Sequence, residues 1–219
     1  MSKVVHPYAH RLVILRDWKS RWFADKNYKN LLEKDVVIRE FLQKKLRGFY
    51  ISRIEIERNA KSTKVMIHTS RPGMIIGRSG EGAVKLKNDL LVALRKRGVV
   101  LSEDLKLDIV EVTNPDADAA IVACSIAEGL EKRLPYRRVI KQSIEKVMSA
   151  NGVKGARIYL GGRLAGAEIA RSEQIKRGSI PLQTFRADVD FAREKAHMSY
   201  GDIGIKVWIY RGEVFEKTK

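Results

Sequence analysis

The chain has little cysteine, little histidine and no long hydrophobic run. Its one cysteine, Cys124, excludes an intramolecular disulfide, and the apolar helical context "AAIVACSIAEGL" predicts a small buried residue. Four histidines without a second cysteine show no zinc-ligand spacing, so we expect no metal and no cofactor. No apolar stretch is long enough to span a bilayer, and the N-terminus lacks the apolar core of a signal peptide. These absences predict a protein of a reducing compartment, the cytoplasm.

Acidic residues are also scarce relative to basic ones. The 219 residues include 43 Lys and Arg against 26 Asp and Glu, a formal net charge of +17. Such an excess attracts polyanions, either nucleic acid or an anionic membrane surface. A peripheral membrane protein would concentrate the charge on one amphipathic helix, whereas here it is spread over most of the chain. The composition therefore favours nucleic acid.

Hydrophobic periodicity divides the first half into short elements. Apolar spacings of three, four and seven predict helices over residues 31–46 and 83–94, and alternation predicts strands over 51–58, 64–70 and 105–112. A short helix over 72–76 precedes the glycine-rich "GRSGEG". The order is helix, strand, strand, short helix, glycine loop, helix, strand. We expect the aromatic and basic N-terminal segment (Arg11, Arg16, Trp18, Trp22) to pack on this sheet, with RNA contact as the second possibility.

Asn114-Pro115 marks a boundary, after which the pattern restarts. Two helical patterns, interrupted by Pro135, are followed by four strand-like runs over 156–162, 164–171, 184–192 and 204–212. Two helices and four strands predict a two-layer α+β domain. We therefore expect two domains, residues 1–115 and 116–219.

The glycine loop admits three functional interpretations besides an ordinary turn. A P-loop requires Lys-Ser or Lys-Thr after its last glycine, and none follows. A dinucleotide fold requires the spacing G-x-G-x-x-G directly after a strand, which is also missing. A G-x-x-G turn between two helices, flanked by strands in this order, is typical of a type II KH module, which binds single-stranded nucleic acid. Glycines let a sugar-phosphate backbone approach main-chain N–H groups. The candidate RNA-binding residues are Gly77, Arg78, Ser79, Gly80, Lys85 and Lys87.

Longer motifs resemble one family, the third small-subunit ribosomal protein in its bacterial form. "KVVHPYAHRL", "IERNAKSTKVMIHTSRPGMIIGRSGE" and "GGRLAGAEIARSEQIKRGSIPLQTFRADVDFA" carry the resemblance, which extends from residue 1 to about residue 215. It implies an α+β protein: a type II KH domain (α-β-β-α-α-β) followed by a two-layer α+β domain of two helices and a four-stranded sheet. It also implies a structural, non-enzymatic role in the head of the small ribosomal subunit.

The resemblance implies specific partners: small-subunit rRNA, mRNA, and the tenth and fourteenth proteins of that subunit. In the family, a basic cluster on the second domain lines the channel through which mRNA enters and assists strand separation. The matching residues are Arg137, Arg138 and Lys141. Further candidate rRNA contacts are Lys3, His6, Arg11, Arg163, Arg171 and Arg177.

Physical reasoning supports part of this expectation. Residues 131–180 hold twelve Lys and Arg against four Asp and Glu. On a helix, Arg137, Arg138 and Lys141 share one flank, where Glu145 is placed to pair with Lys141. The alternative is an ordinary solvated helix face. With no nucleotide-binding loop, any unwinding must be passive.

Two other functions are weighed against this one. A free-standing KH regulator of mRNA would not need the second domain. A DNA-repair nuclease would need a catalytic constellation. Asp188 and Asp190 alternate on one strand face, which predicts solvent exposure or ion pairing instead.

Overall fold

The computed structural model describes residues 5–59, 61–98 and 104–215, which form two compact units. The loop unit is Trp18–Thr113, and the C-terminal unit combines Asn114 onward with the chain up to Asp17. No helix among the described residues is long and apolar enough to cross a membrane.

The loop unit has the predicted element order. Its elements are β1 (Ser20–Arg21), α2 (Tyr28–Lys45), β2 (Ile51–Arg58), β3 (Ser62–Thr69), α3 (Pro72–Ile76), the 3-10 turn η1 (Arg78–Gly80), α4 (Glu81–Lys96) and β4 (Asp104–Glu111). The sheet order is β1-β2-β3-β4, with β2 and β3 antiparallel and β4 parallel to β3. The α-β-β-α-α-β expectation is confirmed.

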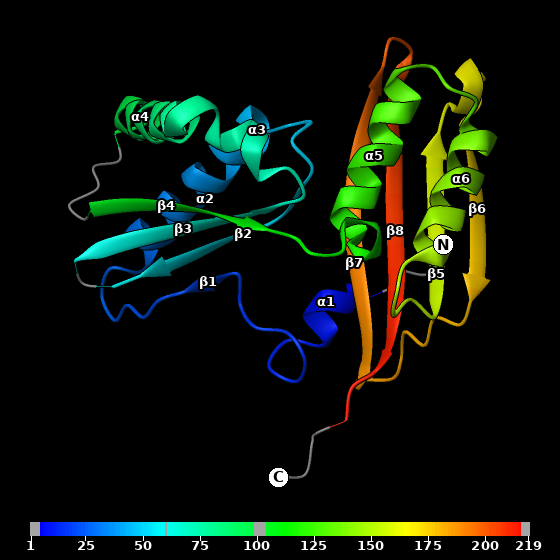
Figure 1. The fold of residues 1–219 in the computed structure, drawn as a ribbon, viewed down its shortest axis with the longest axis horizontal. Coiled ribbons are helices and arrows are strands. Elements are labelled where there is room, and N and C mark those ends of the chain that lie inside the picture. The colour runs from blue at the N-terminus through cyan, green and yellow to red at the C-terminus, as the bar shows by residue number, and fades with distance from the viewer. Residues whose placement is uncertain (1–4, 60, 99–103, 216–219) are drawn as a thin grey trace. The chain divides into compact units, whose positions relative to one another are not determined.

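One hydrophobic core holds this unit together. Alternation in β2 and β3 buries Ile54, Ile56, Val65 and Ile67 on the face that α2 and α4 cover (Figure 1). The helices contribute their periodic apolar residues, such as Leu42 and Leu90, both fully buried. Burying each large aliphatic side chain stabilises the fold by about 1.5–3 kcal/mol.

A buried ion pair attaches the segment before α2 to the same unit. Both side chains of the Arg58–Asp35 pair are 3% exposed, and the Arg58 Nη2 lies 2.6 Å from Asp35 Oδ1. The second carboxylate oxygen accepts a hydrogen bond from Trp22 Nε1 at 2.8 Å, and Arg58 Nη1 donates to Thr63 Oγ1 at 3.0 Å. These bonds satisfy the two charges, which would otherwise be costly to bury.

The C-terminal unit is a two-layer α+β domain, as predicted. Its elements are α1 (Pro7–His10), η2 (Pro115–Ala117), α5 (Ala119–Glu131), α6 (Tyr136–Ser149), β5 (Gly155–Gly162), η3 (Leu164–Gly166), β6 (Arg171–Gly178), β7 (Ala187–Met198) and β8 (Gly201–Glu213). The antiparallel sheet has the order β6-β5-β8-β7, and α5 and α6 lie on one face of it (Figure 1). Cys124 of α5, expected to be buried, is partly exposed.

One predicted strand is misplaced. Residues 164–171 form η3 and an irregular segment, and the strand β6 begins only at Arg171. Ala165 and Gly166 have positive φ values of 54° and 79°, which an extended strand does not allow. The true strand, "RSEQIKRG", lies at the sheet edge with most of its residues exposed, so its sequence has little hydrophobic alternation.

The N-terminal segment divides between the two units, which corrects the expectation that it packs on the first sheet. Trp22 belongs to the loop unit, but Arg11 and Arg16 belong to the C-terminal unit. The Arg11 side chain is 0% exposed and donates to five backbone carbonyls, those of Pro7, Pro181, Leu182, Thr184 and Ala187. Burial lowers the pKa of the Arg11 guanidinium, and the nearby Asp188 carboxylate opposes that shift. Arg11 is therefore an internal clamp and offers no surface to RNA.

Candidate nucleic-acid interface

The glycine loop joins α3 to α4 through left-handed backbone. Gly77 and Gly80 have φ values of +71° and +82°, conformations that glycine adopts at little cost. Ser79 between them has φ +52°, so three of four consecutive residues are left-handed. Gly77, Arg78 and Ser79 are exposed, and a Cβ at Gly80 would meet nothing within 4 Å. The loop is thus open to an approaching ligand.

A neighbouring glycine has a different purpose that sequence reasoning missed. A Cβ at Gly82 would lie 2.6 Å from the Ile75 carbonyl oxygen and 2.8 Å from that of Ile76. Such distances are prohibitive, so glycine at this position lets the first turn of α4 pack against the end of α3. The spacing G-x-x-G-x-G combines two conformational glycines with one packing glycine.

The charges around the loop suit an anion. Arg78 and Lys85 are exposed and pair with no carboxylate among the described residues, whereas Lys87 lies 3.9 Å from Asp104. Gly80 begins α4 without a side-chain cap, so no side chain occupies the N–H groups of the first turn. Phosphate binds well at such a helix N-terminus. Arg78 and Lys85 therefore support the prediction more directly than Lys87 does.

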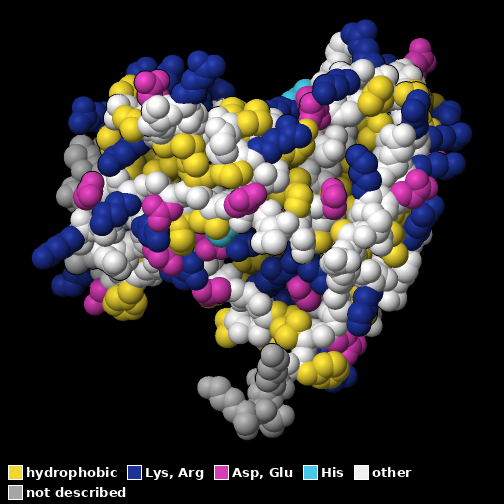
Figure 2. All heavy atoms as spheres, in the orientation of Figure 1, with side chains coloured by type: hydrophobic (Ala, Val, Ile, Leu, Met, Phe, Trp, Pro, Cys, Tyr) yellow, Lys and Arg dark blue, Asp and Glu magenta, His cyan; other side chains and the backbone are white. Residues whose placement is uncertain are grey.

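Apolar side chains next to the loop are exposed. Met74 and Ile76 of α3 are 54% and 37% exposed, and Val84 of α4 is 61% exposed. Figure 2 shows hydrophobic side chains gathered between α4 and β4, with Lys and Arg side chains over α4. An apolar surface beside cations can receive bases while the cations hold phosphates.

A second basic surface lies on α6. Arg137, Arg138 and Lys141, hereafter the α6 face, are all exposed, and the helix buries Val139, Ile140 and Ile144 on its other side. Arg138 and Lys141 pair with no carboxylate among the described residues, while Arg137 Nε lies 3.3 Å from Glu173 Oε1 of β6. The Tyr136 hydroxyl and then the Glu173 carboxylate raise the pKa of Arg137.

The expected pair between Glu145 and Lys141 does not form. Glu145 instead lies 3.3 Å from Arg177, which reaches α6 from β6. Tertiary contact outweighs the helical i, i+4 spacing here, which by itself is worth only a few tenths of a kcal/mol. Lys141 is left available, and Arg177 is partly occupied. Figure 2 shows Lys and Arg side chains gathered along the α6 and β6 side of this unit.

Comparison with known proteins matches this two-part arrangement. A family model described as a KH domain matches residues 37–117, and one described as the C-terminal domain of ribosomal protein S3 matches residues 126–209. Small ribosomal subunit protein uS3 of Clostridium botulinum (strain 657 / Type Ba4) is 46% identical over 220 residues, covering 100% of this chain and 96% of the relative. The chain belongs to the uS3 family. The uS3 proteins of Clostridium acetobutylicum and Clostridium novyi are 45% and 44% identical over the same shares.

Membership in uS3 confirms the predicted family and makes the chain a ribosomal protein. The relatives are named as proteins of the small ribosomal subunit and not as enzymes, which agrees with the expectation of no enzymatic activity. Asp188 and Asp190 form ion pairs, as one of the two alternatives predicted. Asp190 Oδ2 accepts from Arg211 and from the Ala119 N–H, each at 3.0 Å, and Asp188 pairs with Arg16.

The other candidate rRNA residues of this uS3 chain differ in exposure and in their contacts. Arg171 is exposed and pairs with no carboxylate of the described chain. Arg163 donates to the Ala167 and Tyr200 carbonyls at 2.9 and 3.2 Å. It therefore links the turn after η3 to the turn between β7 and β8. His6 caps α1 by accepting from the Ala9 N–H, and its ring packs edge-on against Phe191. Lys3 lies outside the described residues.

Proposed function

We propose that this chain is a structural component of the small ribosomal subunit that binds rRNA through its glycine loop and mRNA through its α6 face. The loop supplies bare backbone, helix N–H groups and two free cations, the requirements for holding a sugar-phosphate strand. The place of action is the cytoplasmic ribosome, and neighbouring subunit proteins, the tenth and fourteenth among them, are its expected protein contacts.

The observation that carries the proposal is the open glycine loop. Burial of Gly77–Gly80 inside the protein, or neutralisation of Arg78 by a carboxylate, would have removed its capacity to hold RNA. Neither occurs: Gly77, Arg78 and Ser79 are exposed and the Gly80 Cβ position is open. The structure of the loop is therefore compatible with a ligand that approaches main-chain atoms closely.

The α6 face supports the mRNA part of the proposal. Guanidinium and ammonium groups on one helix flank bind phosphates without reading sequence, as a surface that meets every message must. Nothing on this helix could couple a chemical reaction to movement. The face therefore acts passively, by holding single strands while the translating ribosome supplies the work.

The test replaces Arg137, Arg138 and Lys141 together by alanine in ribosomes. Translation through a stable mRNA hairpin should slow, while an unstructured message of equal length should be translated at the normal rate. The matched control replaces Arg193, Lys195 and Lys206, three exposed cations of β7 and β8 in the same unit, and should leave both rates unchanged. Equal slowing on both messages would refute the mRNA role.

Sedimentation distinguishes this function from that of a free-standing RNA regulator. The chain should co-sediment with the small subunit in a sucrose gradient and remain there at moderate salt. A chain that stays at the top of the gradient, bound to mRNA alone, would favour the regulator.

A further inference from the structure

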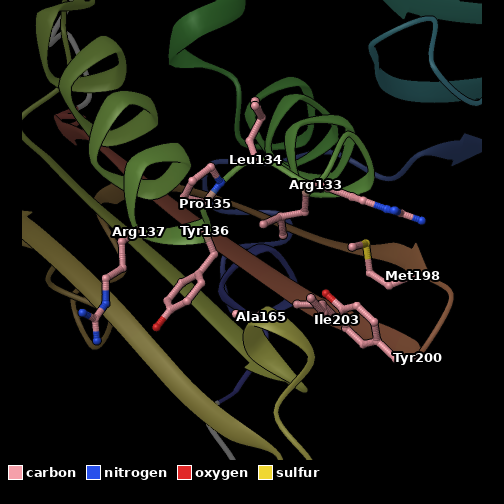
Figure 3. A pocket seen from close by; sticks show the side chains of 10 residues that line it. Arg133, Leu134, Pro135, Tyr136, Arg137, Ala165, Met198, Tyr200 and Ile203 are labelled. Carbon is pink, nitrogen blue, oxygen red and sulfur yellow. The ribbon is translucent and has the colours of Figure 1, made fainter.

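A pocket in the C-terminal unit has no part in the function proposed so far. It has a volume of about 610 Å³ and lies where the connection between α5 and α6 meets η3 and the turn from β7 to β8 (Figure 3). Its lining residues are Leu130, Arg133, Leu134, Pro135, Tyr136, Arg137, Ala165, Met198, Tyr200 and Ile203. The volume falls within the range of small-molecule sites, about 300–1,000 Å³.

The lining combines aromatic rings with cations. Tyr136 and Tyr200 contribute rings from two sides of the pocket, and Figure 3 shows Arg137 near Tyr136 while Arg133 extends away on the other side, above Met198. No carboxylate is among the described lining residues, and the one described carboxylate that reaches a lining cation is Glu173 of β6, 3.3 Å from Arg137 Nε. Leu134, 51% exposed, adds an aliphatic side chain to the lining. This composition fits a flat, negatively charged ligand.

Backbone strain is concentrated in the pocket wall. Arg133 has φ +60° directly after the end of α5, a position where glycine is the usual residue. Ala165, in η3, has φ +54°. Left-handed backbone costs a side-chain-bearing residue about 1–2 kcal/mol. An arginine held there at that cost points to a use for its guanidinium.

Arg163 holds two walls of the pocket in place. Its guanidinium joins the Ala167 carbonyl, next to η3, to the Tyr200 carbonyl in the turn between β7 and β8. The same group lies 5.9 Å from the centre of the Tyr200 ring. The ring is therefore positioned before any ligand arrives, which reduces the entropy lost on binding.

We propose that this pocket receives one unstacked base of a single-stranded RNA, against the rings of Tyr136 and Tyr200, with Arg133 and Arg137 at the flanking phosphates. The inference rests on the proposed function, because Arg137 belongs both to the pocket and to the α6 face. A strand that follows the α6 face reaches the pocket through this residue. Base stacking on aromatic rings is tolerant of sequence, so the pocket would hold a separated nucleotide of any message.

The experiment compares two RNAs in solution. Both are short uridine strands, one with a central 2-aminopurine and one abasic at that position. The full chain carries Ser79→Asp to weaken the glycine loop. Tyr200→Leu and Tyr136→Leu should each lower affinity for the first RNA about 5- to 150-fold and abolish its fluorescence quenching. Affinity for the abasic RNA should stay within about twofold, because no base is there to stack.

Two further variants keep the result interpretable. Tyr28→Leu removes a tyrosine that is 57% exposed on the other unit and should change neither affinity. Arg133→Gly relieves left-handed backbone, so the fold should be no less stable while affinity for both RNAs falls. Equal effects of the tyrosine variants on both RNAs, or no effect, would overturn the proposal that the pocket binds a base. The pocket would then be assigned to contact with a neighbouring protein. If alanine at Arg137, Arg138 and Lys141 also changes nothing, the mRNA part of the proposed function fails.

Discussion

At the scale of single residues, left-handed backbone marks the places where this chain bears strain. Five described non-glycine residues have positive φ: Val13, Tyr50, Ser79, Arg133 and Ala165. Three of them, Ser79, Arg133 and Ala165, lie in the surfaces to which we assign RNA, and the other two, Val13 and Tyr50, lie outside those surfaces. Substitutions in the two groups can therefore distinguish backbone strain that serves RNA binding from backbone strain that only lowers stability.

Val13 provides the first prediction. It is β-branched, has φ +70° and is 82% exposed, so its side chain gains little in return for the strain. Val13→Gly should raise the free energy of unfolding of the C-terminal unit by about 1 kcal/mol, measured by urea denaturation with Trp208 fluorescence. Ile14→Gly is the matched control: Ile14 has no positive φ, so glycine there should be neutral or destabilising. A loss of stability from Val13→Gly would contradict the strain argument.

Arg11 provides a second prediction. Arg11→Ala removes a guanidinium that serves five carbonyls, and should lower the stability of the C-terminal unit by more than about 3 kcal/mol. Arg171→Ala, an exposed arginine of the same unit, should change stability by less than about 0.5 kcal/mol. The same denaturation experiment checks both. Similar, small effects of the two substitutions would show that Arg11 is not a clamp.

Residue chemistry was only partly predictable from the sequence. The glycines at 77 and 80 follow from their spacing, but the purpose of Gly82 depends on carbonyls of α3 that approach it only in the folded unit. Arg11 reads as a surface cation because arginine is usually exposed. Its burial depends on backbone carbonyls about 170 residues away in sequence, which no local pattern reveals.

At the scale of elements, the glycine loop and α4 act together. In the proposed function, the loop lets an RNA strand approach closely, and α4 directs its N-terminal N–H groups at the same point. Ser79 is the suitable position for a test because it is exposed and left-handed, a conformation that Asp and Asn both tolerate.

Ser79→Asp and Ser79→Asn form a pair matched in size but different in charge, which allows a third prediction. The aspartate should repel phosphate and lower the affinity for single-stranded RNA at least about tenfold, since a like charge in close contact costs more than 1.4 kcal/mol. The asparagine should bind nearly as well as the wild type. Fluorescence anisotropy with a labelled RNA gives both values, and circular dichroism confirms the fold. Equal loss in the two variants would mean that the loop does not contact phosphate.

Most elements were predictable because their hydrophobic periods are regular. The α2, β2, β3 and α4 patterns each bury one face, and β3 alternates along its whole length. The strand predicted over residues 164–171 was wrong because the hydrophobic period is irregular in this part of the chain. An edge strand buries few side chains, so β6 has a charged sequence. The turn before it has apolar residues, whose pattern resembles that of a strand.

At the scale of the whole molecule, charge is the dominant property. A net charge of +17 opposes compaction in isolation and attracts an RNA of opposite sign. Membership in the uS3 family is consistent with this charge, since a protein of the small ribosomal subunit associates with rRNA. The two predicted domains resemble the two family matches, but the sequence could not show that the first seventeen residues join the C-terminal unit.

The salt dependence of RNA binding tests the central claim most directly. If six to ten phosphates of a single strand are neutralised, the affinity of the chain for that RNA should fall roughly 10²- to 10⁴-fold between 50 and 200 mM salt. Replacing Arg137, Arg138 and Lys141 by alanine should make the log–log slope for a single strand shallower by about 2, since each contact contributes about 0.7. An affinity independent of salt, or identical slopes for wild type and variant, would contradict the account.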